Sequence, residues 1–197
     1  MYLRPVFTVE DQARIVALIA SNPFGVLVTT GAGGMEGSHL PFVVRQEEGA
    51  LVLEAHVAAA NPQVAALAGG TALAIFTGPH AYIAPGWYRT QPAVPTWDYA
   101  AVHVHGTLEL CDGADETATI LRTLGVGDPA GFDLDALTET YRAQMFKGIR
   151  AFRLRATKVE AQWKMSQNRS REDRESVVAA LRAQGNAACA DLIAETL

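Results

Sequence analysis

The chain has 197 residues and a mass of 21.0 kDa, with 49% hydrophobic and 19% charged residues, which excludes disorder throughout. Its net charge is −5, and its two cysteines, Cys111 and Cys189, lie far apart, so neither a disulfide framework nor a thiolate zinc site is expected. The first eleven residues lack the basic and apolar regions of a secretory signal. Prolines and glycines interrupt the one long stretch without charge, so we expect a cytoplasmic protein with no membrane span.

Charge is distributed unevenly along the chain. Residues 55–108 contain two of the 37 charged residues, Arg89 and Asp98, but four of the five histidines. This composition is typical of a ligand pocket, a subunit interface or a histidine-rich core. Residues 142–174 carry a net charge of +7. That charge is compatible with direct DNA binding without indicating it, because no helix-turn-helix pair is visible.

Periodicity and turn residues predict a series of strands, with helices at the ends and in one insertion. Thr8 is the expected N-cap of the first helix, and Asn61 that of a brief helix beginning at Pro62. The other helices are expected over residues 115–124, 133–145, 170–184 and 186–197, after a first one over 8–20. The strands are expected over residues 24–30, 38–44, 50–57, 71–77, 100–110 and 149–159, with a long connection over 78–97.

Strands that follow one another through short hairpins favour an antiparallel sheet over alternating βαβ units. We therefore predict a β-rich α+β fold in which the sheet closes into a barrel with peripheral helices. We expect residues 1–197 to form a single domain with a helical insertion at about 114–146 and a C-terminal helical tail at about 170–197. A ligand would then bind at a mouth, a seam or a dimer interface.

Several motifs are excluded as sources of chemistry. The glycine cluster over residues 31–34 is a hairpin turn rather than a dinucleotide-binding loop, because Glu36 replaces the last glycine and a strand follows. His103 and His105 share one face of a strand, but such a pair more often packs or binds carbonyls than holds a metal, so we expect no metal. No serine or cysteine has the setting of a nucleophile, so we assign no catalytic residue.

A flavin mononucleotide (FMN) needs an apolar seam for its ring and donors for its phosphate. The uncharged segment and the basic tail could provide these, so FMN binding is one interpretation among several. Five blocks of the sequence resemble, in the same order, the PaiB family of FMN-binding negative transcriptional regulators. The blocks are residues 37–42 (GSHLPF), 56–63 (HVAAANPQ), 76–83 (FTGPHAYI), 94–99 (VPTWDY) and 163–169 (WKMSQNR).

The resemblance implies an antiparallel split β-barrel of the FMN-binding type, a homodimer with FMN at the subunit interface, and a repressor role. It implies FMN contacts from eight residues, namely Thr29, Ser38, His39, His56, Asn61, Trp97, Lys164 and Gln167. Two departures from the family pattern lower the expected affinity for FMN. Ala59 stands where relatives often carry a basic residue, and Asp98 stands where asparagine is expected.

Three functions remain open at this stage. The first is a flavin-responsive regulatory homodimer that is not an enzyme. The second is a flavin-dependent oxidoreductase on the same barrel. The third is a haem-binding or metal-binding barrel, suggested by the histidines His103 and His105.

Overall fold

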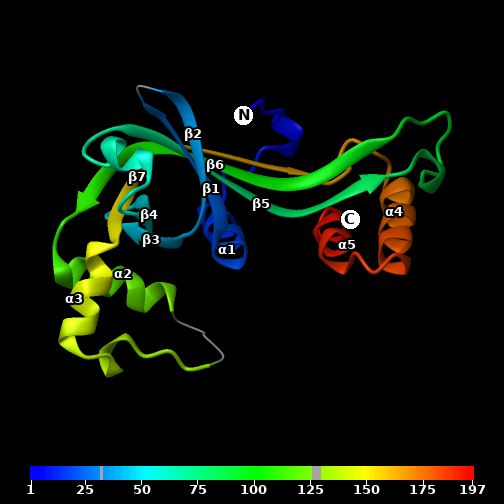
Figure 1. Ribbon diagram of the computed structural model, residues 1–197. Coiled ribbons are helices and arrows are strands. Elements are labelled where there is room, and N and C mark those ends of the chain that lie inside the picture. The colour runs from blue at the N-terminus through cyan, green and yellow to red at the C-terminus, as the bar shows by residue number, and fades with distance from the viewer. Residues whose placement is uncertain (32, 126–129) are drawn as a thin grey trace. The chain divides into compact units, whose positions relative to one another are not determined.

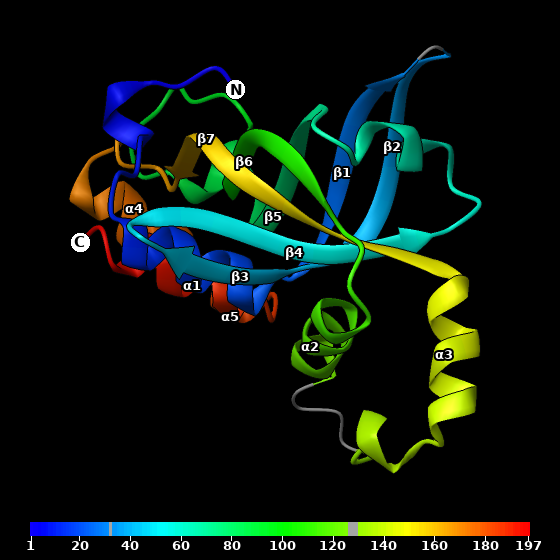
Figure 2. The same cartoon turned by 90° about the vertical axis from the view of Figure 1, so that its left-hand side faces the viewer.

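A seven-stranded antiparallel sheet is the framework of the computed structural model, which describes residues 1–31, 33–125 and 130–197. The strand order is β2-β1-β5-β6-β7-β4-β3 (Figures 1 and 2). The strands are β1 (Phe24–Gly31), β2 (Gly34–Pro41), β3 (Val43–Glu47), β4 (Ala50–Ala58), β5 (Thr71–Ile83), β6 (Thr96–Cys111) and β7 (Ile149–Lys164).

Helices lie at both ends of the chain and in one insertion between β6 and β7, with two short ones between other strands. The α-helices are α1 (Gln12–Ser21), α2 (Ala114–Leu124), α3 (Glu139–Lys147), α4 (Arg171–Ala183) and α5 (Ala187–Ala194). The short 3-10 helices are η1 (Pro5–Phe7), η2 (Pro62–Ala66), η3 (Pro85–Trp87) and η4 (Leu134–Ala136). Among the described residues, no helix combines the length and apolarity needed to cross a membrane.

The chain forms two compact units, and β5, β6 and β7 contribute residues to both. The first unit consists of Met1–Leu18, Thr77–Val102 and Glu160–Leu197. The second consists of Ile19–Phe76 and His103–Val159.

The core of the second unit contains a cluster of three aromatic rings, of which Phe76 lies on β5, Phe152 on β7 and Phe42 between β2 and β3. The ring of Phe42 packs edge-on against those of Phe76 and Phe152, with centroids 5.3 and 6.4 Å away. Edge-to-face pairs of this kind stabilise a core beyond the area that they bury. The β3–β4 hairpin closes tightly because Glu48 and Gly49 both have positive φ, as a two-residue turn between antiparallel strands requires.

In the first unit, α4 and α5 lie side by side (Figure 1). Ser170 caps α4 by accepting a hydrogen bond from the Asp173 amide at 3.1 Å, which confirms the cap expected there. Asn186 caps α5 in the same way, through the amide of Cys189. The apolar face that α4 buries includes Val177 and Leu181.

Local contacts correct four of the expected boundaries. The first helix begins at Gln12, because Asp11 accepts hydrogen bonds from the Ala13 and Arg14 amides, whereas the Thr8 hydroxyl donates to the Arg4 carbonyl. The strand expected over 38–44 is two strands, because the residues before Phe42 pair with β1 whereas Val43 and its successors pair with β4. The Phe42 amide between them donates to the Pro23 carbonyl, the last contact with the β1 side.

The connection expected over 78–97 is shorter, because β5 continues to Ile83 and β6 begins at Thr96. Gly78 permits that extension: a Cβ there would lie 2.7 Å from Leu18 Cδ1. The helix expected over 133–145 is the short η4 followed by α3, which Thr138 caps through the Tyr141 amide. Two expected turns fall partly on residue 32 and on residues 126–129, outside the described residues.

At Gly106, β6 lies closer to β7 than a side chain would allow. This position therefore provides a test of how β6 and β7 are aligned. A methyl group at this position would clash with the Arg155 carbonyl oxygen and lie 2.7 Å from Leu154 Cδ2. We predict that Gly106→Ala lowers the free energy of unfolding by about 1–3 kcal/mol, measured by urea denaturation. The matched control is Gly37→Ala, whose methyl meets Val26 Cγ1 at an ordinary 3.8 Å. Equal stability of the two variants would contradict the register.

Candidate functional site

Asn61 joins η2 to β2 within the second unit. Its side-chain oxygen accepts a hydrogen bond from the Gln63 amide at 2.9 Å, which confirms the predicted N-cap. Its side-chain Nδ2 donates to Ser38 Oγ, also at 2.9 Å. The start of η2 is therefore fixed against β2 by an amide that serves both elements.

Gln63 continues these contacts into the interior. Its side chain is 2% exposed, and its Nε2 lies within hydrogen-bond distance of three acceptors, the Leu27 carbonyl at 3.2 Å, Thr29 Oγ1 at 3.0 Å and the Glu36 carbonyl at 3.1 Å. We call the side chains of Thr29, Ser38, Asn61 and Gln63 the amide network. It contains three of the eight predicted FMN contacts, together with one residue that was not singled out.

A cavity of about 400 Å³ lies against the amide network, between β1, the β1–β2 turn and η2. Thr29 and Gln63 line it together with Glu36. The side-chain Oε1 of Gln63 is buried and has no hydrogen-bond partner among the described residues. A buried acceptor without a partner costs about 1–3 kcal/mol, so this atom favours a ligand that brings an N–H donor.

The donor set fits the ring of FMN better than its phosphate. The oxidised flavin ring carries one N–H, and either the Gln63 Oε1 or the Thr29 hydroxyl oxygen is suited to accept a hydrogen bond from it. Glu36 gives the cavity a negative side chain, which repels a phosphate dianion. Ser38 accepts from Asn61 and keeps its own hydroxyl proton, so it is the donor of the amide network that suits a phosphate or a ribityl chain.

The two predicted histidines of the second unit lie outside the amide network. His39, on β2, is exposed, and its ring stacks on that of Phe24 with centroids 6.0 Å apart. His56, on β4, is half-buried, and its Nδ1 is buried without a partner among the described residues. Burial lowers the pKa of His56, so its imidazole is held neutral and is available as a donor or an acceptor rather than as a cation.

Lys164 belongs to the first unit, where its ammonium group already forms hydrogen bonds with neighbouring residues. Its ammonium donates to Thr96 Oγ1 at 2.6 Å, to the Trp97 carbonyl oxygen and to Asp98 Oδ1 at 3.3 Å. An ammonium group has three N–H donors, and each has an acceptor. An FMN phosphate that binds Lys164 must therefore displace one of these contacts.

The other two predicted contacts of the first unit differ from each other in exposure. The side chain of Trp97 is 56% exposed and lines a cavity of about 470 Å³ together with Tyr82 and His80, whose ring centroids lie 6.0 and 6.3 Å away. Gln167 instead closes a turn, because it accepts from the Met165 amide and donates to the Trp163 carbonyl, both at 2.6 Å. The structure thus places five predicted residues in the second unit and three in the first.

Asp98 is fully buried next to Lys164. Its carboxylate accepts from the Ser166 hydroxyl at 2.6 Å. Desolvation by burial raises the pKa of Asp98, although Ser166 and Lys164 oppose that shift. The negative charge expected to repel an anionic ligand is therefore paired with Lys164 inside the first unit rather than presented to solvent.

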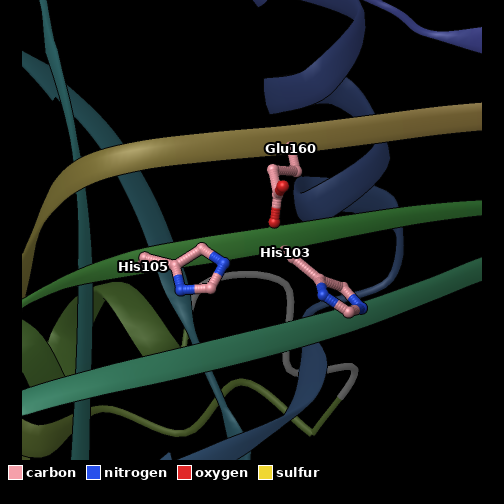
Figure 3. A group of neighbouring side chains, drawn as sticks. All are labelled: His103, His105 and Glu160. Carbon is pink, nitrogen blue, oxygen red and sulfur yellow. The ribbon is translucent and has the colours of Figure 1, made fainter. Parts of the chain in front are cut away.

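The histidines that suggested a metal lie on β6 (Figure 3). His103 and His105 are half-buried, and the His105 carbonyl accepts from the Thr157 hydroxyl at 3.3 Å. Glu160, drawn in the same figure, is a buried residue of the first unit that binds the Met1 ammonium at 2.7 Å. The Met1 ammonium therefore competes with any metal cation for this carboxylate.

The sheet and the order of its strands define a split β-barrel of the FMN-binding type. The chain belongs to the family described as "Putative FMN-binding domain", which matches residues 1–158. The family expected from the five sequence blocks is therefore confirmed. A relative within this family is the Bacillus subtilis "Protease synthase and sporulation protein PAI 2", which is 32% identical over 190 residues, covering 94% of this chain and 91% of the relative.

Solved structures share the fold at low sequence identity. The flavocytochrome Anf3 from Azotobacter vinelandii aligns with a TM-score of 0.63 at 12% identity, covering 82% of this chain and 72% of its own. A FAD- and haem-binding protein from Mycobacterium smegmatis aligns with a TM-score of 0.59 at 16% identity, covering 80% of this chain and 73% of its own.

Gln63 is the site residue that sequence reasoning missed. It ends the second of the five blocks, HVAAANPQ, so it was in view as part of a motif. Its role depends on acceptors from β1 and β2, more than 25 residues away in the chain. Only the pairing of these elements with η2 shows that the side chain is buried.

The buried carboxylate predicts a pH dependence of stability. Because the pKa of Asp98 is raised in the folded state, the folded chain keeps a proton that the unfolded chain loses above about pH 4, and stability falls as pH rises through that window. We predict that Asp98→Asn removes this loss, so that its stability relative to the wild type increases as pH rises from about 4 toward the raised folded-state pKa. Urea midpoints measured across that range test it.

Ser166→Ala provides the opposite case. It removes the hydroxyl that favours the charged form of Asp98, so the loss of stability with rising pH is expected to steepen. A stability difference between Asp98→Asn and the wild type that stays constant with pH would refute the proposed burial of a charged group.

Proposed function

We propose that this protein binds FMN and acts as a flavin-responsive regulatory homodimer rather than as an enzyme. The observation that carries the proposal is the buried Oε1 of Gln63, which has no partner among residues 1–31, 33–125 and 130–197, beside a cavity of about 400 Å³ in a chain of the FMN-binding family. FMN brings a ring N–H that satisfies this acceptor, and the free energy of that hydrogen bond favours the bound state.

The residues divide by the chemistry that they offer. Thr29 and Gln63 receive the polar edge of the ring, and the Ser38 hydroxyl and Asn61 hold the ribityl chain or the phosphate. His39 and His56 supply further donors, while Trp97, Lys164 and Gln167 stay assigned to the second side of the site. Because Ala59 offers no cation and Lys164 is paired with Asp98, we expect weaker FMN binding than an arginine at residue 59 would give.

The cavity favours ligand sensing over catalysis. FMN when bound supplies reversible redox chemistry. Among the described residues that line the cavity, however, Glu36 is the only ionisable one, so few groups are available to move protons during turnover. The Bacillus subtilis relative is named "Protease synthase and sporulation protein PAI 2", and its link to sporulation supports a regulatory role in which FMN occupancy changes the contacts of the protein with a partner or with DNA.

Titration of the ligand-free protein with FMN, followed by flavin fluorescence, tests the cofactor assignment. We predict saturable binding by the wild type and about tenfold weaker binding by Ser38→Ala, the effect of losing one hydrogen bond of about 1.4 kcal/mol. The control is Ser176→Ala, a half-buried serine on α4. Lack of binding at high micromolar FMN would remove the proposal, and rapid NAD(P)H oxidation by the FMN-loaded protein would replace the regulator with an oxidoreductase.

The homodimer is supported by the exposed aromatic side chains of the uncharged segment, Trp97 at 56% and Tyr82 at 47%. Exposed apolar side chains that gather around a cavity are typical of interaction surfaces. Light scattering of the purified protein is expected to give twice the 21.0 kDa chain mass. A mass of 21.0 kDa at micromolar concentration, with and without FMN, would contradict the dimer.

A further inference from the structure

A second cavity of the second unit differs in chemistry from the one beside the amide network. It has a volume of about 400 Å³ and lies between α2, α3 and the start of β7. The helices α2 and α3 contact each other, and Figure 2 shows both of them on the same side of the sheet. None of the residues assigned to FMN above lines this cavity. A ligand that binds here is therefore separate from the proposed flavin.

Two cations that line the cavity have no acidic partner among the described residues. Lys147, the last residue of α3, is exposed and forms no ion pair with a described residue. One guanidinium nitrogen of Arg150 donates hydrogen bonds to the carbonyls of Lys147 and Ile149, at 3.2 and 2.7 Å. Arg150 forms no ion pair within the described part of the chain. A guanidinium has five N–H donors, so most of them remain available to a ligand.

The neighbouring arginines of β7, unlike Arg150, are paired with carboxylates. Arg153 binds Glu54 at 3.0 Å and Glu116 at 2.9 Å. Arg155 binds Glu47 at 3.0 Å and Glu109 at 2.8 Å. Each of these two arginines has two carboxylates, whereas Arg150 has none among the described residues.

The remaining wall of the cavity is mostly apolar and uncharged. Phe146 and Ile149 are half-buried, and Cys111 is 5% exposed at the base, where it packs in a small cluster with Ile120 and Ala151. Burial raises the pKa of the Cys111 thiol, so this wall carries no thiolate at neutral pH. Asp112 is the one acidic residue that lines the cavity, which leaves a net charge of +1 from the three ionised side chains.

We propose that this cavity binds a small organic anion, a carboxylate or phosphate monoester attached to an apolar body. Lys147 and Arg150 hold the anionic group, and the Arg150 fork suits the paired oxygens of either anion. Phe146 and Ile149 contact the apolar body. A volume of about 400 Å³ lies within the range of small-molecule pockets and accommodates a phenyl ring with its anionic substituent.

Calorimetric titration of the full chain with phenyl phosphate and with benzoate tests the proposal and separates the two anions. We expect saturable binding of at least one of them, with at least tenfold weaker binding of benzyl alcohol, which lacks the charge, and of inorganic phosphate, which lacks the ring. Benzyl alcohol binding as tightly as the anions would overturn the role of the cations. Inorganic phosphate binding as tightly as phenyl phosphate would overturn the role of the apolar wall.

Variants identify the residues that carry the binding. Lys147→Ala and Arg150→Ala are each expected to weaken binding about tenfold or more, Arg150→Lys to lose less, and Asp112→Asn to tighten it by removing a like charge. The matched control is Lys158→Ala, an exposed cation of β7 that does not line the cavity. An equal loss in Lys158→Ala, or no loss in the two cavity variants, would refute the site. Both alanine variants alter residues at the surface, and circular dichroism verifies their folding.

Repeating the titration with saturating FMN distinguishes this site from the proposed flavin site. Unchanged affinity for phenyl phosphate is expected, because no residue assigned to FMN lines the cavity. Competition between the two ligands would overturn the separation of the sites. A protein that binds phenyl phosphate but not FMN would leave the anion site in place and remove the flavin proposal.

Discussion

The side-chain amide of Gln63 is the constraint on which the candidate site depends. Its Nε2 lies within hydrogen-bond distance of acceptors on β1 and β2. An amide nitrogen placed among three oxygens fixes the orientation of the group, because reversing it would set oxygen against oxygen. The amide oxygen is therefore directed away from these three acceptors and is buried with no hydrogen-bond partner in the described part of the chain. The same contacts that attach η2 to the hairpin thus create the acceptor that favours a ligand.

Ion pairing decides which cations remain for ligands. In the first unit, Lys164 neutralises the buried Asp98, so a residue that looks suited to a phosphate mainly stabilises its own surroundings. In the second unit, Arg153 and Arg155 pair with carboxylates, whereas Arg150 and Lys147, beside a cavity, have no acidic partner among the described residues. Residue type alone does not distinguish these cases, because pairing depends on neighbours far away in the chain.

The sequence predicts most of the strands and two of the caps where the determining contacts are local, although the first helix begins after Asp11 rather than at Thr8. Asn61 and Ser170 cap the elements that follow them, as their positions indicate. Prediction is wrong where a distant contact decides. The strand expected over 38–44 divides at Phe42 because the residues before it pair with β1 and those after it pair with β4, and β5 extends through Gly78 because the missing side chain leaves room for Leu18. Gln63 was missed for the same reason, since β1 and β2 supply its acceptors.

The most direct test of the central claim is the NMR signal of the Gln63 side-chain amide during titration with FMN, assigned by its loss in Gln63→Met. The account predicts a saturable shift of this signal that follows the same binding curve as flavin fluorescence. A Gln63 signal that stays unchanged while FMN binds elsewhere on the protein would contradict it.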